Sequence, residues 1–179
     1  MLDWNAVVTL YQGGFRYGVR ILREFGAVEP TDYHNVVVMT VRDPGAFLCA
    51  LEERVAKDPR LYDAISRAAP AICCFAFHSP EELEKEAEMV ISKWLPRLLG
   101  RSFHVRLHRR GHKTGLRSPD IEKHLGTNIL TRLEQLGAPG SLEFQDPDTV
   151  IAIDTIDERA GMSIWSREEL ERFKLLRPD

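Results

Sequence analysis

The sequence predicts a two-part α/β protein in which short strands alternate with helices. Two observations carry this prediction: β-branched apolar runs such as 35–41 recur along the chain, and helix-start signals such as Ser79-Pro80 stand between them. The chain has 179 residues, of which 44% are hydrophobic and 28% charged, which is enough for two small sandwiches of helices on a sheet. We place the first domain at residues 1–70 and the second at 71–179.

The first domain is expected to begin with a β-branched strand. Its elements are, in order, a strand over 6–10, a helix over 15–25, a strand over 35–41, a helix from Pro44 and a shorter helix over 61–68. Gly26 is a natural C-terminal stop for the first helix. Pro44 fits the first turn of its helix, where the missing N–H costs little.

The second domain is expected to have two helices between its strands. Its elements are an extended run over 72–77, a helix from Ser79 to Leu95, a strand over 103–108, a glycine-containing loop, a helix from Ser118 to Leu136, strands over 149–154 and 160–165, and a final helical stretch over 166–176. Ser79-Pro80-Glu81 combines a cap, a first-turn proline and an acidic residue facing the helix dipole.

Positive charge is concentrated in one stretch. From Arg97 to Arg132 there are nine Lys or Arg residues against two acidic ones, a net +7, whereas the whole chain carries −3, which leaves −10 for the rest. A basic stretch on an acidic background indicates a localised anionic partner. Inside it, apolar residues alternate with His104, Arg106 and His108, so one strand face should pack on the core while the other presents imidazole and guanidinium groups to solvent.

We predict that this basic stretch binds RNA or another polyphosphate. The strand leads through a loop to a helix N-terminus, where backbone N–H groups and basic side chains can bind phosphate. The alternative is an ordinary solvated charged surface. The predicted RNA-binding residues are His104, Arg106, His108, Arg109, Arg110, His112, Lys113, Arg117 and Lys123.

The histidines do not have metal-site spacing. Four strand residues rise about 13 Å, whereas zinc ligands lie about 2 Å from the ion, so His104 and His108 cannot share one. The three cysteines show no ligand spacing either. We expect neither a metal nor a cofactor.

Two other functions stay open at this point. An acidic group lies between Asp146 and Glu158, and paired carboxylates could serve a small-metabolite enzyme; however, Asp-Pro-Asp is also common turn chemistry, and no known catalytic motif accompanies it. We therefore expect no catalytic residue. Alternatively, the chain could be a protein–protein interaction module whose basic face binds an acidic protein.

Several segments of the chain resemble the stand-alone THUMP-domain proteins, the group that includes the adaptor for tRNA cytidine N4-acetylation. They cover nearly the whole chain and are found, in order, at residues 5–15, 102–112, 118–126, 144–154 and 161–164. The resemblance implies an N-terminal ferredoxin-like domain followed by a THUMP domain, which together bind the acceptor arm and 3′ CCA end of tRNA. Residues 12–14 are less charged than in relatives, so no RNA contact is assigned there.

The resemblance also implies a non-catalytic role. In that group a separate domain or partner performs the modification, so we expect a tRNA-binding adaptor that presents tRNA to an enzyme such as an RNA cytidine acetyltransferase. No apolar run approaches the roughly 20 residues that span a bilayer, and the first residues lack the layout of a signal peptide. We therefore expect a cytoplasmic protein whose partner is tRNA and not DNA or a membrane.

Overall fold

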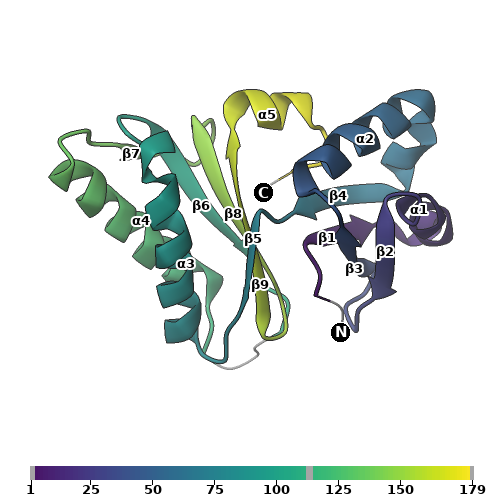
Figure 1. Ribbon diagram of the computed structural model, residues 1–179, viewed down its shortest axis with the longest axis horizontal. Helices are drawn as coiled ribbons and strands as arrows, with labels where there is room; N and C mark the ends of the chain where they lie inside the picture. Colours follow the sequence, from purple (N-terminus) through teal and green to yellow (C-terminus); the bar gives the residue numbers. More distant parts are fainter. Residues whose placement is uncertain (1–2, 112–114, 178–179) are drawn as a thin grey trace. The chain divides into compact units, whose positions relative to one another are not determined.

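The computed structural model describes residues 3–111 and 115–177 (Figure 1). Its contacts divide the chain into two compact units. The first unit runs to Ile72 and also includes Leu170–Arg177, and the second comprises Cys73–Glu169. The sequence-based boundary after residue 70 lies close to this division, but residues 170–177 pack with the first unit instead of the second. No helix in the described part of the chain is long and apolar enough to cross a membrane.

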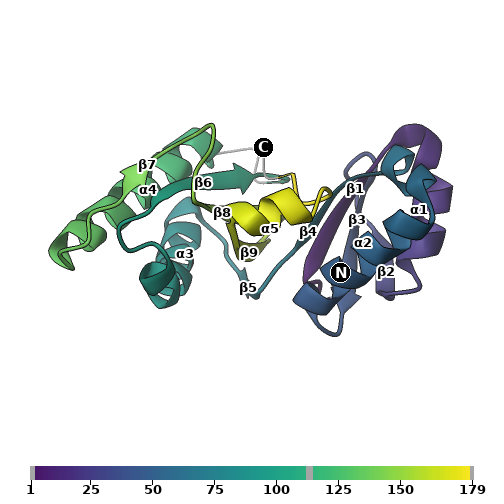
Figure 2. The ribbon, with the colours of Figure 1, turned by 90° about the horizontal axis from the view of Figure 1, so that it is seen from above.

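The first unit has the element order β-α-β-β-α-β, which is the order of ferredoxin-like sandwiches. Its elements are β1 (Ala6–Leu10), the 3₁₀ turn η1 (Gln12–Gly14), α1 (Phe15–Leu22), β2 (Gly26–Pro30), β3 (Val36–Val41), α2 (Pro44–Lys57), η2 (Pro59–Asp63) and β4 (Ile65–Pro70). The strands form an antiparallel sheet in the order β2-β3-β1-β4. Figure 2 shows α1 and α2 on the same side of this sheet.

Local signals fix the start of α2, and distant packing closes the core. The Asp43 carboxylate accepts a hydrogen bond from the Ala46 N–H at 2.8 Å, with Pro44 in the first turn as predicted. Leu175 is fully buried in the core of the first unit, and the Ala68 N–H donates to its carbonyl at 2.8 Å. The C-terminal segment therefore completes this unit.

The prediction of a helix over 61–68 is wrong. These residues form η2 and then β4, which pairs antiparallel with β1 and places Ala68 opposite Val8. Alanine favours helices locally, but pairing in a buried sheet overrides that preference. The first helix also ends at Leu22 instead of residue 25, and the strand β2 that follows was not predicted.

The second unit has a five-stranded mixed sheet in the order β5-β9-β8-β6-β7. Its elements are β5 (Cys73–Ala76), α3 (Pro80–Trp94), η3 (Leu95–Arg97), β6 (Ser102–His108), α4 (Ser118–Gln135), β7 (Ser141–Leu142), β8 (Thr149–Ile156), β9 (Arg159–Ser166) and α5 (Arg167–Arg172), the last of which runs into the first unit. β6 is parallel to β7 and β8, and β8 and β9 form an antiparallel hairpin. The short strand β7 was not predicted.

α3 and α4 cover the same face of this sheet (Figure 1). Their apolar stripes share one core with Phe103, Val105 and Leu107 of β6. The burial of β6 alternates residue by residue, which confirms the expected half-buried strand. The side chains of His104, Arg106 and His108 therefore lie on the face of β6 that the helices do not cover, which we call the outer face.

Candidate nucleic-acid interface

The outer face of β6 places three predicted residues in a row. His104 is opposite Val150 of β8, Arg106 opposite Ala152 and His108 opposite Asp154. All three side chains are half-buried. Residues i and i+2 of a strand are about 6.6 Å apart, so these groups form a short, regularly spaced polar row.

The edge of β6 beyond β7 is occupied by an acid from α4. β7 pairs only with Ser102 and Phe103, and farther along the strand the Leu107 N–H donates to the Glu122 carboxylate at 2.7 Å. This bond satisfies a strand N–H that has no neighbouring strand. Glu122, one of the two acidic residues in the basic stretch, therefore has a structural role in attaching α4 to the sheet.

His104 is a neutral polar group rather than a cation at physiological pH. Burial lowers its pKa below the usual value, and nearby Arg106 lowers it further, whereas Glu122 acts in the opposite direction. Its ring meets Phe144 edge-to-face, with 4.9 Å between centroids. His104 can therefore donate or accept a hydrogen bond but adds little positive charge.

The adjacent Arg109 and Arg110 have different environments. Arg109 is exposed, and its guanidinium donates to the Gly111 carbonyl at 3.0 Å. Arg110 binds the carboxylate of Asp154 at 3.2 Å, with side-chain exposures of only 18% and 6%. Its backbone also exchanges hydrogen bonds with Thr155 and Asp157. Arg110 therefore serves the internal structure at the end of β6, and Arg109 is the more accessible cation.

Gly111 fits closely against the turn after β8. Its φ is +95°, and a Cβ there would lie 2.7 Å from the Cα of Asp157. Only glycine avoids both the strain and the clash. The next two predicted residues, His112 and Lys113, lie outside the described residues.

The remaining two predicted residues lie on α4. Arg117 is the N-cap residue, exposed and 3.5 Å from the Asp120 carboxylate. Lys123 is exposed one turn into the helix and lines a shallow groove of about 640 Å³ together with Asp120, Thr127, Asn128 and Arg132. Since α4 covers the opposite face of the sheet, Lys123 does not lie beside the polar residues on the outer face of β6.

Not all of the basic stretch is available to a partner. Arg97 pairs with Glu169 at 3.5 Å, and Arg132 donates to the Ser92 hydroxyl at 2.8 Å. Within residues 3–111 and 115–177 no ion pair is found for Arg101, Arg106 or Lys123. The net +7 of the sequence therefore overstates the positive charge that is free to meet an anion.

Sequence reasoning missed a second basic surface, on α1. Arg16, Arg20 and Arg23 follow at intervals of four and three residues and are all exposed, so they share one helix face at the surface of the first unit. Arg20 also lies over the Tyr17 ring at 5.2 Å. The spacing was visible in the sequence, but the overall acidity of this part of the chain concealed it.

The acidic residues considered for catalysis are not gathered into one site. Asp146 and Asp148 precede β8, whereas Asp157 and Glu158 follow it. A strand of this length extends about 26 Å. Asp154 is paired with Arg110, and Glu158 lies 3.2 Å from His78. Among the described residues, no cluster of three or more His, Cys, Asp or Glu side chains could hold a metal.

Fold and surface together define a small α/β module with helices on one face of the sheet and the polar side chains of the basic strand β6 on the other. The family model of the THUMP domain matches residues 77–164, which lie inside the second unit. The chain therefore contains a THUMP domain, as its resemblance to that family predicted. No curated protein sequence matches the chain.

Three solved structures share the fold across 90% of this chain. PH1313 from Pyrococcus horikoshii Ot3 has a TM-score of 0.60 at 15% identity over 54% of its own length. TrmN from Thermus thermophilus has a TM-score of 0.58 at 18% identity, over 44% of its own length. A 4-thiouridine synthetase, solved in complex with RNA and with bound ATP, has a TM-score of 0.50 at 15% identity, over 41% of its own length. The chain thus spans about half or less of the length of these proteins.

Proposed function

We propose that this chain binds the acceptor arm and 3′ end of tRNA and presents the tRNA to a separate modifying enzyme of the RNA cytidine acetyltransferase class. The observation that carries the proposal is the THUMP domain, an RNA-binding module, in the unit that holds the basic strand β6. The similarity of the fold to that of a 4-thiouridine synthetase solved in complex with RNA also supports RNA binding.

The basic surface suits a phosphate backbone. Arg106 lies in β6 and Arg109 directly follows it, and both can form charge-assisted, two-pronged bonds with phosphate oxygens. His104 and His108 can add hydrogen bonds beside them. Contacts of this kind give affinity that falls steeply with salt concentration.

The acceptor-end proposal is tested with one tRNA in two forms, intact and trimmed of its single-stranded 3′ end. Fluorescence anisotropy at a low and a moderate salt concentration should show tighter binding of the intact form and weaker binding of both forms at higher salt. Equal affinities that do not respond to salt would contradict it.

The adaptor role is tested by purifying the tagged chain from native extract. We expect tRNA and a tRNA-modifying enzyme to co-purify, with the enzyme retained after ribonuclease treatment. If tRNA is recovered without such an enzyme, the adaptor role is contradicted while RNA binding stands. If an acidic protein is recovered that tRNA displaces, the basic face is instead a protein-binding surface.

A further inference from the structure

The loop between β7 and β8 exposes an aromatic residue, Phe144, at the surface. Phe144 is 67% exposed, more than any other large hydrophobic residue described in this chain. A single exposed apolar residue is common and needs no explanation by itself. What distinguishes Phe144 is the support given to its loop and the chemistry of its neighbours.

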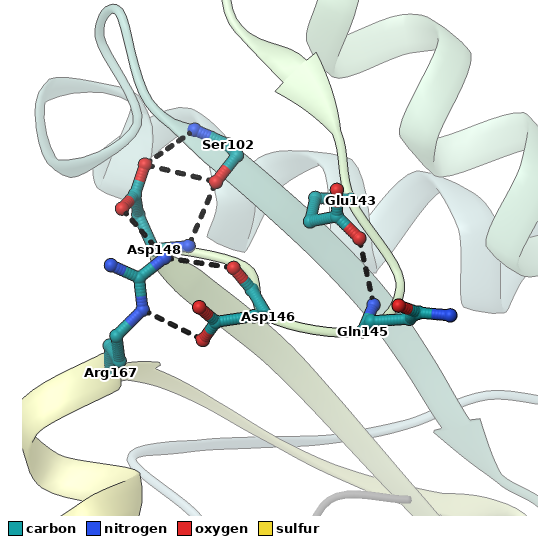
Figure 3. Close-up of polar contacts among 6 residues, drawn as sticks. All are labelled: Ser102, Glu143, Gln145, Asp146, Asp148 and Arg167. Atoms are coloured by element: carbon teal, nitrogen blue, oxygen red, sulfur yellow. Dashed lines mark hydrogen bonds and ion pairs between the residues drawn. The ribbon is translucent and has the colours of Figure 1, made fainter.

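The loop is fastened at both ends (Figure 3). At its start, the Glu143 N–H donates to the Phe103 carbonyl at 3.1 Å, and the Glu143 carboxylate accepts from the Gln145 N–H at 2.9 Å. The peptide group before Glu143 and the one after Phe144 are therefore both held in place. A side chain on such a backbone loses less freedom on binding a ligand than one on a loose loop.

At its end, the loop is held by charged side chains. The Asp148 carboxylate accepts from both the N–H and the hydroxyl of Ser102 at 2.9 Å. Arg167 binds the Asp146 carboxylate at 2.9 Å and that of Asp148 at 3.2 Å (Figure 3). These bonds give both carboxylates a structural role in holding the loop.

The ring of Phe144 lies against the basic strand. It meets His104 edge-to-face, with an interplanar angle of 76°. Burial lowers the pKa of His104; Glu122 opposes this effect, and Arg106, two residues further along the same strand face, adds to it. Arg101, exposed and without an ion pair in the described chain, precedes the strand. An exposed aromatic ring therefore lies beside the imidazole of His104, with Arg106 two residues further along the strand and Arg101 just before it.

We propose that Phe144 is a stacking platform for one unpaired nucleobase of a single-stranded RNA segment, with Arg101 and Arg106 binding the phosphates on either side. Every base has a π-face, so stacking of this kind tolerates any sequence but requires a base that is not paired in a duplex. This inference rests on the proposed RNA binding and adds the residue that would hold an unpaired base of the single-stranded end.

The test uses a short RNA duplex with a 3′ overhang, made with normal nucleotides or with abasic ones that keep the phosphates. Phe144→Ala should weaken binding of the normal overhang by roughly 5- to 100-fold and leave binding of the abasic overhang unchanged. Phe144→Tyr should retain affinity for both. Leu136→Ala, at another exposed apolar position, is the matched control and should change neither. Circular dichroism verifies that each variant folds.

The outcomes distinguish a failure of the stacking platform from a failure of the proposed RNA binding. If the wild-type chain binds both RNAs and Phe144→Ala weakens them equally or not at all, the stacking platform is excluded while RNA binding stands. If the wild-type chain binds neither RNA at low salt, the proposed function fails and this inference with it. A loss confined to the normal overhang supports the platform.

Discussion

Arg109 and Arg110 are neighbours in sequence, but their replacement by alanine should have different effects on stability. The Asp154 carboxylate is 6% exposed and has the Arg110 guanidinium 3.2 Å away. Removing one partner of a buried ion pair costs about 3–5 kcal/mol because a buried charge loses its partner. Water can reach part of the Arg110 site, so we expect about 2–3 kcal/mol for Arg110→Ala. Arg109→Ala should change the free energy of unfolding by less than about 0.5 kcal/mol.

Urea unfolding followed by circular dichroism and by tryptophan fluorescence measures this difference. A chain of two units need not unfold in one step, so the transition of the second unit, which contains Trp94 and Trp165, is the one to compare. Adding Asp154→Asn to Arg110→Ala should recover part of the loss, because a neutral amide is less costly to bury than a carboxylate. If both alanine variants unfold at the same urea concentration, the structural role of Arg110 is refuted.

Two further predictions concern the ends of the basic strand. Gly111→Ala should destabilise the second unit by about 1–3 kcal/mol, whereas Gly100→Ala, which has positive φ but open space, should cost only about 1 kcal/mol; equal urea midpoints would contradict the close contact with Asp157. Hydrogen bonds from Ser102 hold the pKa of Asp148 below its usual value, so its stabilising effect should be present above about pH 4 and lost as the pH falls further. The difference in melting temperature between wild type and Ser102→Ala should accordingly shrink from pH 6 to pH 3, and a constant difference would contradict it.

The sequence predicted the elements whose pattern is local. The alternation in β6 and the capped starts of α2 and α3 depend on neighbouring residues, and the structure places them as expected. β2 and β4 depend on partners far along the chain. Gly26–Pro30 is a strand because it pairs with β3, and Ile65–Pro70 because it pairs with β1. Neither segment has an alternating pattern of its own.

The candidate site shows the same limit. Period-two alternation indicated which side of β6 each residue faces, but it ends at His108, so the sequence could not show that Arg110 turns to Asp154, 44 residues away in the chain. Phe144 was overlooked because exposure and loop support are not visible in composition. An aromatic residue two positions before an Asp-Pro-Asp turn was the only signal.

The most direct test of the central claim, that the basic strand binds RNA phosphates, is the salt dependence of tRNA affinity. The slope of log K against log salt reports how many phosphates are contacted, and losing one contact reduces it by about 1. Arg106→Gln should show this reduction. Lys93→Gln, which removes the same charge from an exposed site on α3, should keep the wild-type slope. An unchanged slope for Arg106→Gln would contradict the claim.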